Sequence, residues 1–233
     1  MNAIITGATQ GIGKAIAERF LEEGWSIAIC ARNWNDLQQV QLEWTSNFPH
    51  QQIYIFKADL SIKEEVKSFA DFVLSHFQTI DVLVNNAGIF MPGKLAEEAE
   101  GQLEQMIAVN VYSAYHLTRA LLPNMKNNKK GHIFNMCSVA SLKAYDNGGS
   151  YSISKYALMG FSDNLRHELI GTGIRVTALM PGATMSRSWA NAPVDKDRLM
   201  PAKDVASMVW AAYQLAQNTD LETIVMRPIL GDL

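Results

Sequence analysis

The chain has 233 residues, a formal net charge of −3 at pH 7, and a hydrophobic share of 48%. This share can cover both faces of a sheet, so the composition excludes a disordered protein. The longest basic run is the pair Lys129 and Lys130, which is too short for a nucleic-acid surface. The apolar stretches are as short as strands, far below the about 20 residues of a membrane-spanning helix. We therefore expect neither nucleic acid nor a membrane as a partner.

The two cysteines, Cys30 and Cys137, both lie in apolar runs that are typical of buried strands. Reduced thiols packed in the core are therefore expected rather than a disulfide, and the dispersed His and Cys residues predict no metal site. Residues 2–6 pass straight into a glycine-rich loop, without the basic leader and long apolar stretch of a signal peptide. These features predict a soluble, cytoplasmic protein.

Short segments with strand character alternate with longer amphipathic segments along the whole chain. We expect strands at 2–6, 26–31, 52–57, 81–85, 131–137, 174–180 and 223–226. The helical patterns between them include 11–23, 62–77, 103–125, 150–170 and 201–216. Repeated βα units predict a doubly wound α/β fold, with about seven parallel strands and helices on both faces. Because no linker interrupts the alternation, we expect a single domain over residues 1–233.

The segment 182–200, after the sixth expected strand, has the weakest pattern. It follows the carboxyl edge of the sheet, where open α/β sheets bind their ligands. We expect it to form a lid over the substrate, with an ordinary surface loop as the alternative.

A glycine-rich loop connects the first expected strand to the first helix. Gly7 permits a tight turn, Gly11 lets the backbone approach a pyrophosphate, and Gly13 allows close packing. The helix N-terminus then attracts the phosphates, although the spacing departs from G-x-G-x-x-G and a purely structural turn is the alternative. The residues expected to hold the pyrophosphate of a dinucleotide are Gly7, Thr9, Gln10, Gly11, Ile12 and Gly13.

Arg32 stands at the end of the second expected strand, where a dinucleotide fold reads the adenosine ribose. An NAD site would carry Asp or Glu there, whereas Arg forms a charge-assisted fork with a 2′-phosphate. The residue therefore favours NADP(H) over NAD(H), and a solvated surface arginine is the alternative.

Two further groups lie at the same edge of the expected sheet. Ser61 and Glu64 have the spacing of a capping box, which leaves Asp59 free to face the adenine beside Leu60. The residues after the fourth strand that can approach the cofactor closely are Asn86, Ala87 and Gly88.

Tyr151 and Lys155 are four residues apart at the start of a long helix, so they share one face. An adjacent ammonium and an oxidised nicotinamide both favour the phenolate, which makes Tyr151 a candidate acid and base. Ser138 ends the fifth strand, where its hydroxyl can hold a substrate oxygen. Asn110 can anchor a water that passes protons towards Lys155. The alternatives are an exposed Tyr and Lys pair and an ordinary polar Asn.

Together these motifs resemble the short-chain dehydrogenase/reductase family over nearly the whole chain. The resemblance rests on Thr6 and Gly7 with Gly11 and Gly13, on Asp59, 85–88, Asn110, Ser138, Tyr151 and Lys155, and on Pro181, Gly182 and Thr184. It implies a Rossmann domain, a catalytic tetrad of Asn110, Ser138, Tyr151 and Lys155, and a homodimer or homotetramer. It also implies that Lys155 holds the nicotinamide ribose and that Pro181, Gly182 and Thr184 meet the nicotinamide end.

Around 138–155 the chain is similar to 3-oxoacyl-carrier-protein reductases, but its segment 182–200 is shorter than in many of them. The residues 224–228 look closer to family members that act on small hydroxy acids or general carbonyls. The resemblance therefore implies an NADP(H)-dependent oxidoreductase acting on a small-molecule carbonyl or alcohol. The alternatives are a catalytically silent NADP(H) sensor and an enzyme of another reaction type, such as an epimerase or dehydratase.

Overall fold

Seven strands form the centre of the protein in a computed structural model that describes residues 1–186, 189 and 194–232. The strands are β1 (Asn2–Thr6), β2 (Ser26–Ala31), β3 (Ile53–Lys57), β4 (Val82–Asn85), β5 (Gly131–Met136), β6 (Ile174–Pro181) and β7 (Thr223–Met226). They make one sheet in the order β3-β2-β1-β4-β5-β6-β7, and each neighbouring pair is parallel. The order reverses between β1 and β4, where doubly wound sheets open a crevice for ligands. The predicted fold class is confirmed.

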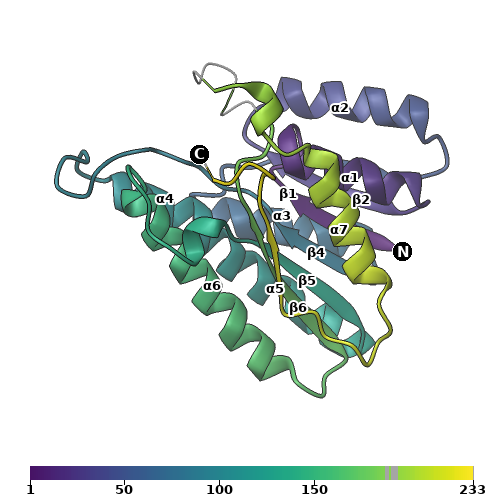
Figure 1. The fold of residues 1–233 in the computed structure, drawn as a ribbon. Helices are drawn as coiled ribbons and strands as arrows, with labels where there is room; N and C mark the ends of the chain where they lie inside the picture. Colours follow the sequence, from purple (N-terminus) through teal and green to yellow (C-terminus); the bar gives the residue numbers. More distant parts are fainter. Residues whose placement is uncertain (187–188, 190–193, 233) are drawn as a thin grey trace.

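Two layers of helices cover the two faces of the sheet (Figure 1). One layer consists of α1 (Gly11–Glu22), α2 (Trp34–Asn47) and α7 (Ala202–Gln214). The other consists of α3 (Lys63–His76), α5 (Ser113–Asn128) and α6 (Gly149–Leu169). The single helix expected over 103–125 is divided into α4 (Gln102–Ile107), a π-helical turn (Ala108–Tyr112) and α5.

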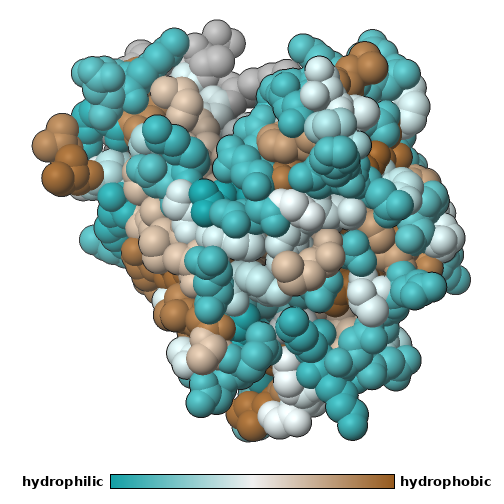
Figure 2. Space-filling view, turned by 90° about the vertical axis from the view of Figure 1, so that its right-hand side faces the viewer, coloured by the Kyte–Doolittle hydropathy of each residue, from teal (hydrophilic) through white to brown (hydrophobic). Residues whose placement is uncertain are grey.

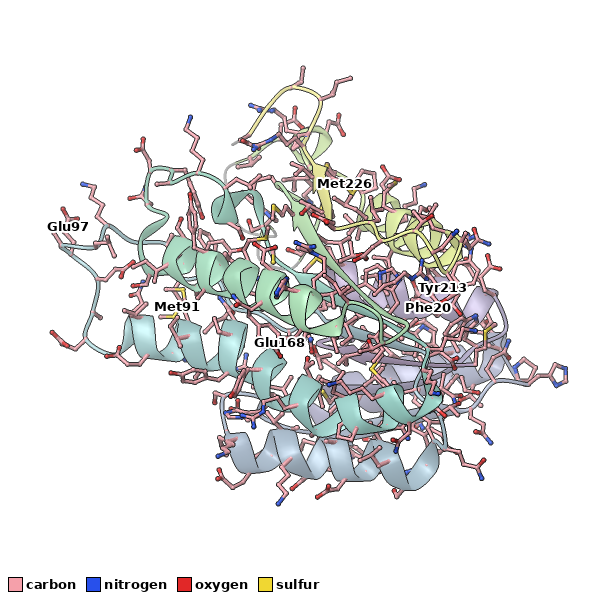
Figure 3. All side chains as sticks on the ribbon, turned by 90° about the horizontal axis from the view of Figure 1, so that it is seen from below. Phe20, Met91, Glu97, Glu168, Tyr213 and Met226 are labelled. Carbon is pink, nitrogen blue, oxygen red and sulfur yellow. The ribbon has the colours of Figure 1, made fainter. Side chains whose placement is uncertain are left out.

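Alternation along β1 explains the two layers, because neighbouring side chains in a strand point to opposite faces. Ile5 packs in the core beneath α1 and α7, whereas Ile4 packs in the core beneath α3 and α5. Aromatic rings fill the first of these cores. The Phe20 ring makes edge contacts with Trp25 and Tyr213, at centroid distances of 4.9 and 6.3 Å (Figure 3).

Helix α2 was not among the expected helices, although its sequence carries the signals of one. The Asn33 side chain accepts hydrogen bonds from the backbone N–H groups of Asn35 and Asp36, at 3.0 and 3.4 Å. This is the geometry of an N-cap, which satisfies backbone donors at the start of a helix. The apolar residues buried by α2 have helical spacing, and they are Leu37, Val40 and Trp44.

The surface is mainly polar on the face shown in Figure 2, where hydrophobic residues form separate spots among hydrophilic ones. Over residues 1–186, 189 and 194–232, no helix has both the length and the apolar character needed to cross a membrane.

Candidate active site

A cavity of about 1310 Å³ lies at the carboxyl edge of the sheet. Its walls come from the loops after β1, β2, β3, β4, β5, β6 and β7, which all end at this edge. Every residue predicted to contact the cofactor lines it: Gly7, Thr9, Gln10, Gly11, Ile12, Gly13, Arg32, Asp59, Leu60, Asn86, Ala87, Gly88, Tyr151, Lys155, Pro181, Gly182 and Thr184. The parallel fold therefore brings together residues that are far apart in the sequence.

The glycine loop has the backbone shape expected of an anion site. Gly7 and Gly11 have φ values of +64° and +56°. Residues with a Cβ adopt such positive values only at a cost in conformational energy. A Cβ at Gly13 would lie 2.4 Å from the Gly7 carbonyl oxygen and 2.4 Å from Asn86 Nδ2. Helix α1 begins at this loop with no acidic residue in its first turn and no side-chain cap. Its first backbone N–H groups can therefore bind phosphate.

Thr6 and Asn86 connect the glycine loop to the end of β4. Thr6 Oγ1 accepts hydrogen bonds from the backbone N–H groups of Asn86 and Ala87, at 3.0 and 2.9 Å. Asn86 Nδ2 donates to the carbonyl oxygens of Thr6 and Gly7, at 2.9 and 3.1 Å. These bonds fix the glycine loop against the residues that follow β4, and both segments line the cavity.

Arg32 and Asp59 lie on the same wall, at the ends of β2 and β3. Burial raises the pKa of Asp59, but hydrogen bonds from Ser61 and the positive charge of Arg32 outweigh this effect, so its pKa is lowered overall. The predicted capping box is wrong, because α3 begins after Ile62 and Ser61 does not cap it. Instead, Asp59 Oδ1 accepts hydrogen bonds from Ser61 N and Ser61 Oγ, at 2.9 and 2.7 Å. A local turn between the two residues brings the Ser61 donors next to the Asp59 carboxylate, so the Ser61 hydroxyl does not cap the helix.

Tyr151 and Lys155 both face the cavity from the first turns of α6. Lys155 is 4% exposed, and its Nζ donates to the Met136 carbonyl oxygen at 2.7 Å. The same Nζ lies 5.7 Å from the centroid of the Tyr151 ring. The Phe90 ring forms a T-shaped pair with the Tyr151 ring, with centroids 4.8 Å apart and an angle of 73° between the planes. The buried Lys155 side chain therefore lies beside the Tyr151 ring in the same cavity.

Ser138 lies two residues after the end of β5, as the N-cap of a 3-10 turn (Val139–Ser141), and it lines the cavity that also contains Tyr151 and Lys155. Its Oγ accepts from the Ala140 N–H at 3.1 Å, which leaves the hydroxyl hydrogen able to donate to a ligand. Ser141 Oγ accepts from Ser138 N at 3.3 Å and donates to the Lys155 carbonyl oxygen at 2.8 Å. Ser138 is therefore connected to α6 through Ser141.

Asn110 is 1% exposed and lies behind the cavity wall, in the π-helical turn. Its Oδ1 accepts from Ile89 N at 2.7 Å, and its Nδ2 donates to the Ile89 carbonyl oxygen at 3.0 Å and to Ser154 Oγ at 2.9 Å. A Cβ at Gly88 would lie 3.3 Å from Asn110 Oδ1 and 3.5 Å from Lys155 Nζ. Asn110 thus supports the loop after β4. Its side-chain oxygen and Lys155 Nζ both lie close to Gly88 in that loop.

The residues predicted from the sequence to meet the nicotinamide, Pro181, Gly182 and Thr184, lie at the end of β6 and directly after it. Gly182 N donates to the Met226 carbonyl oxygen at 2.8 Å, and Thr184 Oγ1 donates to the Gly182 carbonyl oxygen at 2.9 Å. Part of the expected lid, 187–188 and 190–193, lies outside the described residues. Within the described part of that segment, Ser186 and Trp189 line the cavity.

Sequence reasoning missed three residues near Tyr151. Phe90 and Tyr145 line the cavity from the loops after β4 and β5. Glu98 accepts hydrogen bonds from Ser150 at the start of α6. The sequence carries no periodic signal for these loop residues, because their positions depend on how the loops pack.

A glycine loop at a helix N-terminus, facing a Tyr and Lys pair across one cavity, defines a dinucleotide-binding protein of the oxidoreductase class. The family model of the short chain dehydrogenases matches residues 1–197. The chain belongs to this family.

Two solved structures and one sequence relative illustrate the similarity. An uncharacterized oxidoreductase of Staphylococcus epidermidis is 28% identical over 227 residues, covering 97% of this chain and 96% of that protein. An alcohol dehydrogenase from the archaeon Thermococcus sibiricus, complexed with 5-hydroxy-NADP, has a TM-score of 0.90 and 26% identity over 98% of this chain and 96% of its own. The closed form of serine dehydrogenase complexed with NADP+ has a TM-score of 0.89 and 29% identity over 100% of this chain and 97% of its own.

Proposed function

We propose that the protein is an NADP(H)-dependent oxidoreductase that transfers hydride between the nicotinamide ring and a carbonyl or secondary alcohol. The observation that carries this proposal is the pairing of Tyr151 and Lys155 in one cavity, with Nζ 5.7 Å from the centre of the phenol ring. Ser138 lines the same cavity from the loop after β5. Carbonyl reduction requires an acid, a cation that stabilises its conjugate base, and a hydrogen-bond donor to the carbonyl oxygen.

In the reducing direction, Ser138 and Tyr151 donate hydrogen bonds to the substrate carbonyl oxygen, and this polarises its carbon. The reduced nicotinamide cofactor, when bound, would supply the hydride that this carbon accepts. Tyr151 then gives its phenolic proton to the forming alkoxide. Lys155, held by the Met136 carbonyl oxygen, stabilises the phenolate that remains. Asn110 acts as a positioning residue, because its side chain holds Ile89 and Ser154 on either side of the site.

The cofactor assignment is supported by the glycine loop, by Arg32 and by the two solved neighbours that are complexed with NADP+ and 5-hydroxy-NADP. The residues that would hold it are those predicted from the sequence. The α1 N-terminus would bind the pyrophosphate, Arg32 would bind the 2′-phosphate, and Lys155 would hold the nicotinamide ribose.

The oligomeric state is proposed to be a homodimer or homotetramer that covers part of α6. Ile153 and Tyr156 on this helix are 41% and 46% exposed, and Ile170 beyond its end is 70% exposed. Apolar groups left open along one helix favour association with a second copy. Light scattering of the purified protein measures this directly, and a monomer at micromolar concentration would contradict it.

The first test mixes the purified protein with NADPH and a panel of 3-oxoacyl thioesters, keto acids, ketones and aldehydes. Loss of the reduced-nicotinamide absorbance with the wild type, and not with Tyr151→Phe, is the expected result. Near-normal turnover by Tyr151→Phe would refute the assignment of the acid. Tight NADPH binding without oxidation of NADPH by any compound would favour the sensor, and product formation without net oxidation would favour an epimerase or dehydratase.

A further inference from the structure

Three aromatic side chains line the cavity that contains Tyr151, and each comes from a different loop. Phe90 follows β4, Tyr145 follows β5, and Trp189 follows β6. Phe90 and Tyr145 are 42% and 41% exposed, so both keep ring surface open to a ligand. Parallel strands end at one edge of the sheet, and for this reason rings that are distant in the sequence line the same cavity.

Phe90 is held in a defined position next to the reacting group. Its ring forms a T-shaped pair with the Tyr151 ring, at a centroid distance of 4.8 Å and an angle of 73° between the planes. The preceding residue, Ile89, exchanges two backbone hydrogen bonds with the Asn110 side chain, at 2.7 and 3.0 Å. The loop backbone next to Phe90 is therefore anchored to the buried π-helical turn, and a ligand at Tyr151 meets a pre-positioned ring.

Tyr145 approaches the same phenol from the other loop. A Cβ at Gly148 would lie 2.8 Å from Tyr145 Cε1, so the glycine leaves the space that this ring occupies. Burial, and to a lesser extent the neighbouring Tyr151, raise the pKa of Tyr145. Tyr145 therefore stays a neutral phenol when Tyr151 exchanges its proton, and it presents an amphipathic ring rather than a second base.

We infer that the substrate of the proposed reaction carries a flat aromatic or heteroaromatic ring close to its carbonyl group, which packs against Phe90 and Tyr145. Aromatic pairs gain stability from offset and edge-to-face contacts beyond the area that they bury. A small hydroxy acid would leave both rings exposed and would gain nothing from them. The inference rests on the proposed function and selects one class among the carbonyl compounds that the site could reduce.

The kinetic test compares acetophenone with cyclohexyl methyl ketone, which have equal numbers of carbon atoms but differ in flatness and π-electrons. We expect Phe90→Leu and Tyr145→Leu each to lower kcat/KM for acetophenone, relative to cyclohexyl methyl ketone, by about two- to tenfold. The control is Tyr112→Leu, which removes a ring that is 55% exposed and does not line the cavity. An unchanged ratio in both cavity variants would overturn the inference while leaving the reductase intact.

A binding test separates failure of the inference from failure of the proposed reaction. Calorimetry measures the affinity of 1-phenylethanol and of 1-cyclohexylethanol for the NADP+ complex of Tyr151→Phe, which keeps the ring that Phe90 contacts. Tighter binding of the phenyl alcohol, lost when Phe90→Leu is added, supports the aromatic site even if no compound in the first panel is reduced. Equal binding of the two alcohols would contradict it.

Discussion

The Glu98 carboxylate accepts a hydrogen bond of 2.8 Å from the backbone N–H of Ser150 and another from the Ser150 hydroxyl. Glu98 lies in the loop after β4, and Ser150 lies in the first turn of α6, directly before Tyr151. Gly149 permits this contact, because a Cβ there would lie 1.9 Å from Glu98 Oε1. A carboxylate at a helix N-terminus satisfies free donors and complements the helix dipole.

We expect Glu98→Ala to lower the free energy of unfolding by about 1 to 2 kcal/mol, the usual cost of a lost cap. Because Tyr151 is in the same turn, kcat should fall more than the affinity for NADPH does. Urea unfolding and steady-state kinetics measure the two effects. Glu98→Gln keeps an oxygen acceptor, so it should recover part of the kcat.

Glu97→Ala is the matched control for the Glu98 variant. Glu97 is next in the chain, and among the contacts described its side chain makes only an exposed ion pair with Lys94, at 3.4 Å (Figure 3). Such pairs contribute little, so stability should change by less than about 0.5 kcal/mol. Equal effects of the two substitutions would show that Glu98 does not position Tyr151.

Arg32→Ala should weaken NADPH binding about 10- to 100-fold, because this change in affinity corresponds to the free energy of charge-assisted hydrogen bonds to a phosphate. The affinity for NADH should change far less, because NADH has no 2′-phosphate for this side chain. Fluorescence titration with both cofactors measures the difference. An equal loss for NADPH and NADH would contradict the assignment of Arg32.

Gly13→Ala should weaken NADPH binding and lower stability by about 1 to 3 kcal/mol, the cost of overpacking. Its Cβ would lie 2.4 Å from both Gly7 O and Asn86 Nδ2, so the phosphate loop must move. Gly171→Ala is the control, since its φ of +79° makes it strained but nothing lies within 4 Å of the added Cβ. It should cost stability without changing NADPH affinity. Calorimetry of both variants decides whether the close packing at Gly13 shapes the phosphate site.

Acid should destabilise the protein through His132, which is fully buried in β5. Burial, and to a lesser extent the charge of Arg175, hold the pKa of His132 well below 6.5. Well above pH 6.5 the ring is neutral in both the folded and the unfolded protein, so the native state loses no stability through this group. As the pH falls below 6.5, the unfolded chain binds a proton that the native state excludes, so stability falls.

Between about pH 7.5 and pH 5.5, His132 should account for a loss of at most about 1.4 kcal/mol. His132→Gln removes the titrating group and keeps a polar partner for Thr177 Oγ1, which lies 2.7 Å from His132 Nε2. Urea unfolding at the two pH values should show a smaller loss for the variant than for the wild type. The same loss in both proteins would assign the acid sensitivity to other groups.

Local sequence patterns determined the strands, most of the helices and the residues at the edge of the sheet. Hydrophobic periodicity predicts a parallel sheet, and a parallel sheet places the ends of its strands at one edge. Helical spacing alone places Tyr151 and Lys155 on one face. For this reason the predicted cofactor residues could be chosen from the chain, and the structure finds all of them along one cavity.

Only the tertiary structure decided how loops that are distant in the sequence meet around Tyr151. Glu98 and Ser150 are 52 positions apart in the sequence. The Asn110 side chain forms hydrogen bonds with Ile89 and Ser154, which are 21 and 44 positions away. The turn at Asp59 and Ser61 likewise replaced the expected capping box. Loop residues follow no hydrophobic period, and their hydrogen bonds depend on backbone paths that form when the sheet and both helical layers pack together.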